Sequence, residues 1–239
     1  MRIIFDTCVY DMRNKGNVAM LQIAIERVHQ FWPEAELCVI SISPHILRLY
    51  CPTARPISPE GREWDSSDKL LDRIMASLPV ALLRILFEVR EAIWYYLPSL
   101  LSKFRRIEKS SEIPESENLR KSDGAERPPC AYDELLNNTD LYIATGSQYM
   151  SDACQADALK ILDRLKEAHE RGIPTAMVGQ GVGPICDKEL FYRAGEVLPL
   201  VDLLFVRETL TAPRLLESLG VAPERIVFTG DDALELAFR

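Results

Sequence analysis

Residues 175–185 read T-A-M-V-G-Q-G-V-G-P-I, so three glycines and a proline stand directly behind a short apolar run. The run at 175–179 predicts a buried β-strand, because strands that are covered on both faces are nearly continuous in apolar residues. Gly179, Gly181 and Gly183 let the backbone approach a ligand or a facing lobe closely. Pro184 fixes the exit of the loop. The stretch therefore predicts a strand that ends in a binding loop, with Gln180 as its one polar side chain.

Five further apolar runs resemble this one, and they lie at 2–7, 36–41, 140–145, 203–206 and 225–229. Helical periodicity separates several of them, at 17–31, 153–171 and 209–219, and the last two patterns end at Gly172 and Gly220. This alternation predicts an α/β fold with a doubly wound, mainly parallel, Rossmann-like sheet of about six strands. We expect the strand at 175–179 to lie near the middle, where the strand order reverses and ligands bind.

Composition restricts the class of protein. The 239 residues fit a single lobe, and the net charge of −8 argues against nucleic acid as a partner. No cysteine pair shows the C-x-x-C spacing of a zinc site, and the N-terminus lacks the pattern of a signal peptide. The sequence therefore predicts a cytoplasmic protein with reduced thiols.

Residues 70–108 predict an inserted helical region, and the charged, proline-containing run at 109–128 predicts a flexible linker or loop. Charges at Arg84, Glu88, Arg90 and Glu91 interrupt the apolar pattern, so a membrane span is not expected. Two interpretations stay open: the helices pack on the core, or residues 70–106 contact a membrane surface or a partner. The second would place the protein at the inner face of the membrane.

Polar residues follow two of the expected strands and are candidates for binding. After the first strand, Asn14 and Gly16 suit a turn, and Asn17 suits a helix N-cap beside an anion site. The alternative is a capped turn without a ligand. After the strand at 140–145, Gly146 permits a bend that presents Gln148 at the edge of the sheet. Ser151 or Asp152 could cap the next helix.

Arg207 directly follows the buried strand at 203–206, and Asp231 follows the last strand. A guanidinium at the end of a buried strand needs an anionic partner, because an unpaired buried charge is unfavourable. That partner is either Glu208, Asp231 or Asp232, or a phosphate or carboxylate of a ligand. The three histidines lie near expected helices, away from these loops, and no spacing predicts a metal site.

Together these motifs resemble the polysaccharide pyruvyl transferase family. The matching stretches, in order, are N-x-G-N-x-A-M-L at 14–21, the polar glycine loop at 146–152, G-Q-G-V-G-P at 179–184, V-R-E-x-x-T at 206–211 and T-G-D-D-A at 229–233. The resemblance implies the first lobe of a glycosyltransferase B-type fold. It also implies transfer of a pyruvyl group from phosphoenolpyruvate to a sugar hydroxyl, as a ketal, in surface-polysaccharide modification, with no metal or other cofactor.

The chain departs from the family pattern at three places. Ser147 and Gln148 follow Gly146 where the family carries more glycine, and Glu208 stands where the family usually has Asp. In the family a second lobe with an Arg-x-His motif follows the segment at 229–233, and the 239 residues reach Arg239 just after that segment. We therefore expect little activity from the isolated chain, and a second-lobe polypeptide or a homo-oligomer is a candidate partner beside the sugar acceptor. Asp152 and Asp231 are the candidate bases, and the catalytic acid is unknown.

Two other functions remain open. The first is a non-catalytic binding or assembly module that retains the fold. The second is a lobe of a sugar-nucleotide glycosyltransferase.

Overall fold

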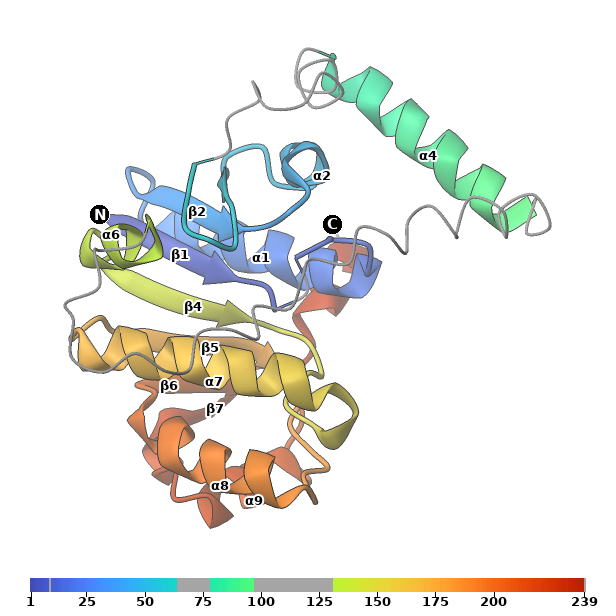
Figure 1. Ribbon diagram of the computed structural model, residues 1–239. Helices are drawn as coiled ribbons and strands as arrows, with labels where there is room; N and C mark the ends of the chain where they lie inside the picture. The colour runs from blue at the N-terminus through green and yellow to red at the C-terminus, as the bar shows by residue number, and fades with distance from the viewer. Residues whose placement is uncertain (9, 64–77, 97–130, 239) are drawn as a thin grey trace, which may run out of the picture. The chain divides into compact units, whose positions relative to one another are not determined.

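The computed structural model of the chain describes residues 1–8, 10–63, 78–96 and 131–238 (Figure 1). The chain forms two compact units, one made of residues 1–65 with 130–239 and the other of residues 66–129. The expected linker at 109–128 lies outside the described residues.

A sheet of seven parallel strands forms the centre of the first unit, in the order β3-β2-β1-β4-β5-β6-β7. The strands are β1 (Arg2–Asp6), β2 (Glu36–Ile40), β3 (Arg55–Ile57), β4 (Leu141–Thr145), β5 (Thr175–Gln180), β6 (Leu203–Val206) and β7 (Ile226–Phe228). The predicted α/β, Rossmann-like fold is confirmed. The additional strand is β3, whose three residues R-P-I contain a proline and carry little apolar pattern.

The strand order reverses between β1 and β4, so the expectation that it reverses at residues 175–179 is wrong. Ile3 pairs with Leu141, which places β4 beside β1, and β5 lies one strand further along. Pairing between strands 138 residues apart is set by how whole strands pack, and the local apolar pattern carries no information on it.

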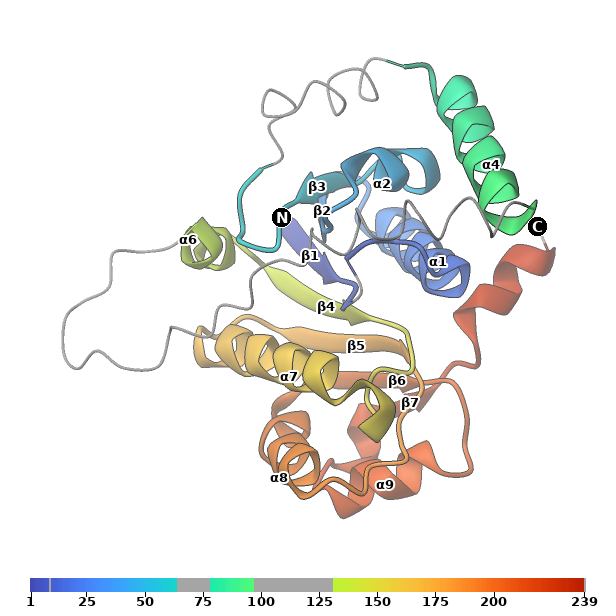
Figure 2. The ribbon, with the colours of Figure 1, turned by 45° about the vertical axis from the view of Figure 1, so that its right-hand side comes forward.

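Helices cover both faces of the sheet. The helix α1 (Lys15–Phe31) lies on one face, and α7 (Gln155–Glu170) with α8 (Lys188–Val197) lies on the other (Figures 1 and 2). The shorter helices of this unit are α2 (Pro44–Tyr50), α6 (Ala131–Asn137) and α9 (Ala212–Ser218). Single-turn helices η2 (Asp152–Cys154), η3 (Leu198–Leu200) and η4 (Pro223–Arg225) connect these elements, and η5 (Asp232–Phe238) packs on α1.

Gly172 and Gly220 follow the ends of α7 and α9 with φ of +73° and +90°, which confirms both helix stops. The expected N-cap at Asn17 is wrong. Asn14 caps α1 instead, because its Oδ1 accepts hydrogen bonds from the N–H groups of Gly16 (2.9 Å) and Asn17 (3.3 Å). The helix therefore begins at Lys15, two residues earlier than the apolar pattern suggested.

A buried polar network joins β1 to β4 and to α7 on one face of the sheet. The Asp6 carboxylate is fully buried, and its Oδ2 accepts hydrogen bonds from Tyr142 Oη (2.5 Å) and Arg164 Nη1 (2.8 Å). The same nitrogen of Arg164 donates to Tyr10 Oη at 2.6 Å. Because buried charges are stable only when paired and hydrogen-bonded, this network fixes α7 on the sheet.

The described part of the second unit contains α4 (Val80–Tyr96). Its exposed apolar side chains include Leu82, Ile85, Leu86 and Val89, with exposed fractions of 41–56%. This spacing of three and four residues places them on one face of the helix. No helix among the described residues is long and apolar enough to cross a membrane.

Candidate functional site

The loops that follow β4 and β5 are joined by backbone hydrogen bonds beyond the ends of both strands. Gly181 N–H donates to the Ser147 carbonyl at 3.0 Å, and Gly183 N–H donates to the Met150 carbonyl at 2.8 Å. Met150 and Val182 form a parallel bridge. The glycine-rich stretch is therefore a paired extension of the sheet at its carboxyl edge, and its shape is fixed by its neighbour.

Gly179 and Gly146 lie in contact where these loops leave the sheet. Gly179 has φ of +66°, a conformation that side chains disfavour, and the register of β5 with β6 shifts at this point. A β-carbon on Gly146 would overlap the carbonyl oxygen of Gly179. A β-carbon on Gly179 would lie 2.7 Å from Asp232 Oδ2. Gly146 thus requires glycine because of close backbone packing, and Gly179 because of its positive φ and the adjacent Asp232 side chain.

Arg207 lies beside Gly181 at the same edge. Its side chain is 21% exposed, and its guanidinium makes two long contacts, 3.5 Å from Nη1 to Asp231 Oδ2 and 3.4 Å from Nη2 to Gln148 Oε1. A strong guanidinium–carboxylate hydrogen bond is about 2.7–2.9 Å long. The positive charge of Arg207 is therefore oriented by its neighbours but only weakly neutralised by them.

The Gln180 side chain is fully buried, on the inner side of this loop. Its Nε2 donates to Tyr149 Oη at 2.9 Å and to the Ala144 carbonyl at 3.3 Å. Its Oε1 is buried without a hydrogen-bond partner among the described atoms. In this conformation Gln180 holds the two loops together from within the protein.

Asp152 uses its carboxylate to join the two loops. Oδ1 accepts hydrogen bonds from Cys186 N–H (2.9 Å) and Asp187 N–H (3.0 Å), and Oδ2 also accepts from Cys186 N–H (2.8 Å). The N–H groups of Asp187 and Cys186 lower the pKa of the Asp152 carboxyl. Such a carboxylate is a weak base, and it does not cap the helix that follows it.

One family model matches the sequence, and it covers residues 14–238. Its description is "polysaccharide pyruvyl transferase". The chain belongs to this family. No curated protein and no solved structure matches the chain significantly.

The five stretches that resemble the pyruvyl transferase family lie at the carboxyl ends of strands of the first unit. The structure brings Gln148, Gly181, Arg207 and Asp231 into one contact group, and it brings Gly146 against Gly179 directly behind that group. Gly183 joins the loop through Met150. Asn14, Gly16 and Asn17 form the start of α1, and no hydrogen bond between described residues connects them to Arg207. Because Asn14 occupies two of the first N–H groups of the helix, fewer remain for an anion.

Glu208 is not the partner of Arg207. It accepts hydrogen bonds from the N–H groups of Leu210, Thr211 and Ala212 and from the Thr211 hydroxyl, so it caps the start of α9. Burial raises the pKa of the Glu208 carboxyl, but these hydrogen bonds outweigh it and lower the pKa to about 2. Of the three carboxylates considered from the sequence, Asp231 contacts Arg207.

The third carboxylate, Asp232, pairs with a residue that sequence reasoning missed. Arg27 Nη1 donates to Asp232 Oδ1 at 2.6 Å, and Arg27 Nη2 donates to Glu235 Oε2 at 2.6 Å. Arg27 lies in α1 and stands 205 residues before Asp232 in the sequence. No local pattern of the sequence signals a pair at this separation.

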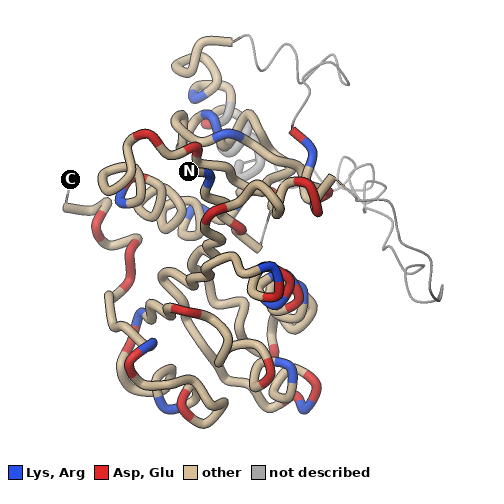
Figure 3. Tube along the Cα trace, turned by 90° about the vertical axis from the view of Figure 1, so that its left-hand side faces the viewer, with Lys and Arg blue, Asp and Glu red and all other residues tan. Residues whose placement is uncertain are grey.

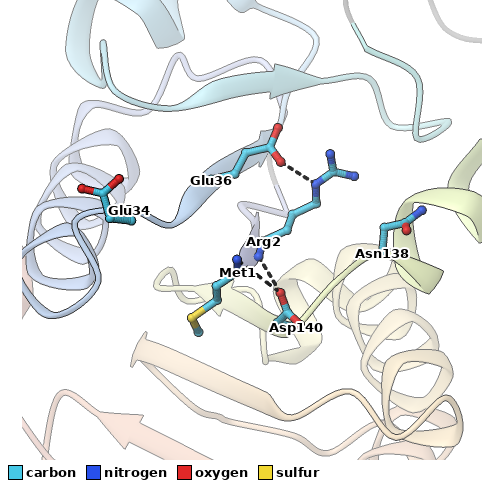
Figure 4. A pocket seen from close by; sticks show the side chains of 6 residues that line it. All are labelled: Met1, Arg2, Glu34, Glu36, Asn138 and Asp140. Carbon is cyan, nitrogen blue, oxygen red and sulfur yellow. Dashed lines mark hydrogen bonds and ion pairs between the residues drawn. The ribbon is translucent and has the colours of Figure 1, made fainter.

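A depression lies at the opposite, amino edge of the sheet and has a volume of about 590 Å³ (Figure 4). Arg2, Glu36 and Asp140 line it, but they already bind one another, with Arg2 Nε 2.8 Å from Glu36 Oε2 and Arg2 N–H 2.7 Å from Asp140 Oδ2. Parallel α/β sheets bind ligands at the carboxyl edge, so we regard the Arg207 group as the candidate site.

Charge is not concentrated elsewhere on the described trace, where basic and acidic residues are interspersed (Figure 3). Within the described ranges, no group of three or more His, Cys, Asp or Glu side chains could hold a metal ion.

Proposed function

We propose that this lobe binds phosphoenolpyruvate at Arg207 and takes part in transferring its pyruvyl group to a sugar hydroxyl, in surface-polysaccharide modification. Membership of the pyruvyl transferase family supports the reaction class. The observation that carries the proposal is the guanidinium of Arg207, which faces the carboxyl edge and is bound only at 3.4–3.5 Å. A carboxylate or phosphate could replace these contacts with shorter, two-fold hydrogen bonds.

The reaction requires proton transfer as well as anion binding. Two sugar hydroxyls lose their protons and bond through oxygen to the central carbon of phosphoenolpyruvate. The methylene carbon gains one proton, the bond from the central carbon to the phosphate oxygen breaks, and phosphate leaves with the second proton. We propose Asp231 as the base for the sugar hydroxyl. Its Oδ2 lies beside Arg207, whereas Asp152 is hydrogen-bonded to backbone N–H groups.

The catalytic acid is not among the residues of this group, and one guanidinium must serve two acidic groups of the donor. We therefore propose that the 239-residue chain alone has little pyruvyl transferase activity. Cations and an acid from a second-lobe polypeptide, or from another copy of the chain, would complete the site in a two-lobed, glycosyltransferase B-type arrangement. This fits a single Rossmann-like sheet serving as one wall of a cleft.

Calorimetric titration with phosphoenolpyruvate tests the anion site directly. We expect weak binding that Arg207→Ala abolishes and that Arg214→Ala, an exposed arginine on α9, leaves unchanged. Equal binding by the unchanged protein and both variants would show that Arg207 does not bind the anion. Tighter binding of a nucleotide sugar would indicate a glycosyltransferase lobe instead, and no binding of either compound would indicate a non-catalytic module.

We further propose that α4 contacts the inner face of an anionic membrane. The apolar face of Leu82, Ile85, Leu86 and Val89 supports this, and basic residues such as Arg105 and Arg106 follow the helix in the sequence. A cytoplasmic location agrees with the five described cysteines, which form no disulfide with one another.

A further inference from the structure

The residues that place Asp231 beside Arg207 are themselves held by α1. Asp232, the next residue in the chain, is 2% exposed, and its Oδ1 pairs with Arg27 at 2.6 Å. Arg27 also pairs with Glu235 of the same segment, with Nη2 of Arg27 2.6 Å from Oε2 of Glu235. The start of η5 is therefore attached to α1 by two short ion pairs.

Asp232 is also confined on its other side. Its Oδ2 is buried without a hydrogen-bond partner among the described atoms. This oxygen lies against the backbone of Gly179, where any β-carbon would be in the way. Burial raises the pKa of the Asp232 carboxyl, and the hydrogen bond and charge of Arg27 oppose this only in part. An enclosed carboxylate with one partner depends on that partner for its position.

Because the two residues are adjacent, the position of Asp232 determines how closely the Asp231 carboxylate can approach Arg207. Asp231 Oδ1 accepts a hydrogen bond from Ala233 N–H at 3.0 Å, while its Oδ2 stops 3.5 Å from Arg207 Nη1. A freely moving carboxylate would close this gap to form a shorter, stronger pair. The attachment to α1 thus holds Asp231 near Arg207 without letting it saturate the guanidinium.

We propose that Asp232 is a positioning residue: held by Arg27, it keeps Asp231 at a distance from Arg207 that leaves the guanidinium available to an anion. The inference rests on the proposed function, in which Arg207 binds the anionic donor. Without the Arg27–Asp232 pair, Asp231 closes on Arg207 and competes with the ligand. Asp231 is therefore an internal competitor that the pair restrains.

Four proteins titrated with inorganic phosphate and with phosphoenolpyruvate test this. We expect Asp232→Asn to weaken binding by about tenfold, a coupling typical of contacting residues. In the background of Asp231→Asn, the same change has no further effect, because the competitor is already gone. A merely structural role would weaken binding equally in both backgrounds, and that result would overturn the proposal.

Glu196→Gln is the control, since it removes the charge of a carboxylate that pairs with Arg193 at 3.0 Å on α8, in an ion pair that does not attach η5 to α1. We expect it to bind anions as the unchanged protein does. Should Asp232→Asn fail to fold, Arg27→Lys keeps the positive charge but loses the two-fold contact. We then expect Arg27→Lys to weaken anion binding in the protein that has Asp231 and to have no effect in the Asp231→Asn background.

Nuclear magnetic resonance of the Arg207 guanidinium separates this inference from the proposed function. We expect Asp232→Asn to shift the Arg207 Nε–H signal and slow rotation of the guanidinium, whether or not any ligand binds. If no anion binds but this shift occurs, the donor site is wrong and the positioning role stands. An identical signal in the unchanged protein and in Asp232→Asn would refute the positioning role.

Discussion

The backbone of Gly181 lies so close to the side chain of Arg207 that a β-carbon at position 181 would overlap Nη2. The guanidinium therefore occupies the space that a side chain at position 181 would need, at the carboxyl edge of the sheet. Because the overlapping atom is at the far end of a flexible side chain, a substitution would displace the guanidinium and leave the backbone in place.

Gly181→Ala should consequently weaken ligand binding while leaving the stability of the protein nearly unchanged. We expect the melting temperature to change little, while phosphoenolpyruvate binding weakens by about tenfold, since the guanidinium turns away from its present partners. Thermal unfolding and calorimetric titration measure the two effects. A variant that binds as well as the unchanged protein would show that the position of the guanidinium is unimportant.

Gly146→Ala should act on stability instead. Its β-carbon would overlap the backbone carbonyl of Gly179, and backbone atoms cannot turn away. Overpacking of this kind destabilises a protein by about 1–3 kcal/mol, measured by urea unfolding. Gly195→Ala, inside α8 and with no neighbour nearer than 3.8 Å, is the control and should stabilise the protein slightly. Equal effects of the two changes would contradict the packing described at Gly146.

Glu208→Gln should destabilise the protein in a pH-dependent way. The pKa of Glu208 is lowered to about 2 in the folded protein from an ordinary value of 4.5, so its carboxylate stabilises the fold above pH 4.5. This contribution is lost as the pH falls from 4.5 to 2. We expect the variant to melt at a lower temperature at pH 7 and the difference to vanish near pH 2. Glu217→Gln, at an exposed position of the same helix, is the control and should melt at pH 7 as the unchanged protein does.

Asp152→Asn should weaken the contact between the loops after β4 and β5. The N–H groups of Asp187 and Cys186 lower the pKa of Asp152, so its stabilising effect is present above the ordinary carboxyl pKa and is lost in acid. We expect a lower melting temperature at pH 7 with unchanged phosphoenolpyruvate affinity. A loss of affinity larger than that of Asp231→Asn would instead favour Asp152 as the ligand-binding carboxylate.

Membrane contact predicts that the protein sediments with anionic vesicles and less so as salt increases. Ile85→Ser, on the apolar face of α4, should reduce the bound fraction severalfold. Leu234→Ser removes an exposed leucine from the other unit and should have no effect. Absence of binding at low salt would refute the proposed membrane contact.

Local patterns predicted most of the sheet and little of the contact network. Six strands were visible as apolar runs, whereas β3 is too short and contains Pro56. The N-cap was misplaced by three residues, since both Asn14 and Asn17 suit a cap and only the path of the loop distinguishes them. The sequence offers three carboxylates, beside a ligand anion, as the partner of Arg207, and only the geometry excludes Glu208 and Asp232.

Contacts across long separations could not be predicted. Arg27 and Asp232 are each ordinary charged residues in the sequence, and only the packing of η5 on α1 brings them together. The sequence predicts Gln180 as a ligand-binding side chain, whereas its burial depends on contacts with Tyr149 and Ala144 from the neighbouring strand and loop, which no local pattern signals.

The position of β1 has a consequence for synthesis on the ribosome. In the finished sheet it lies between β2 and β4, but β4 begins at Leu141, long after β1 and β2 have emerged. Until then β1 exposes one row of unpaired N–H and C=O groups, as an edge strand does, and such edges pair readily with other chains. The nascent chain therefore passes through a stage in which β1, an interior strand of the finished sheet, is an open edge strand, and the pairing of β4 with β1 ends that stage.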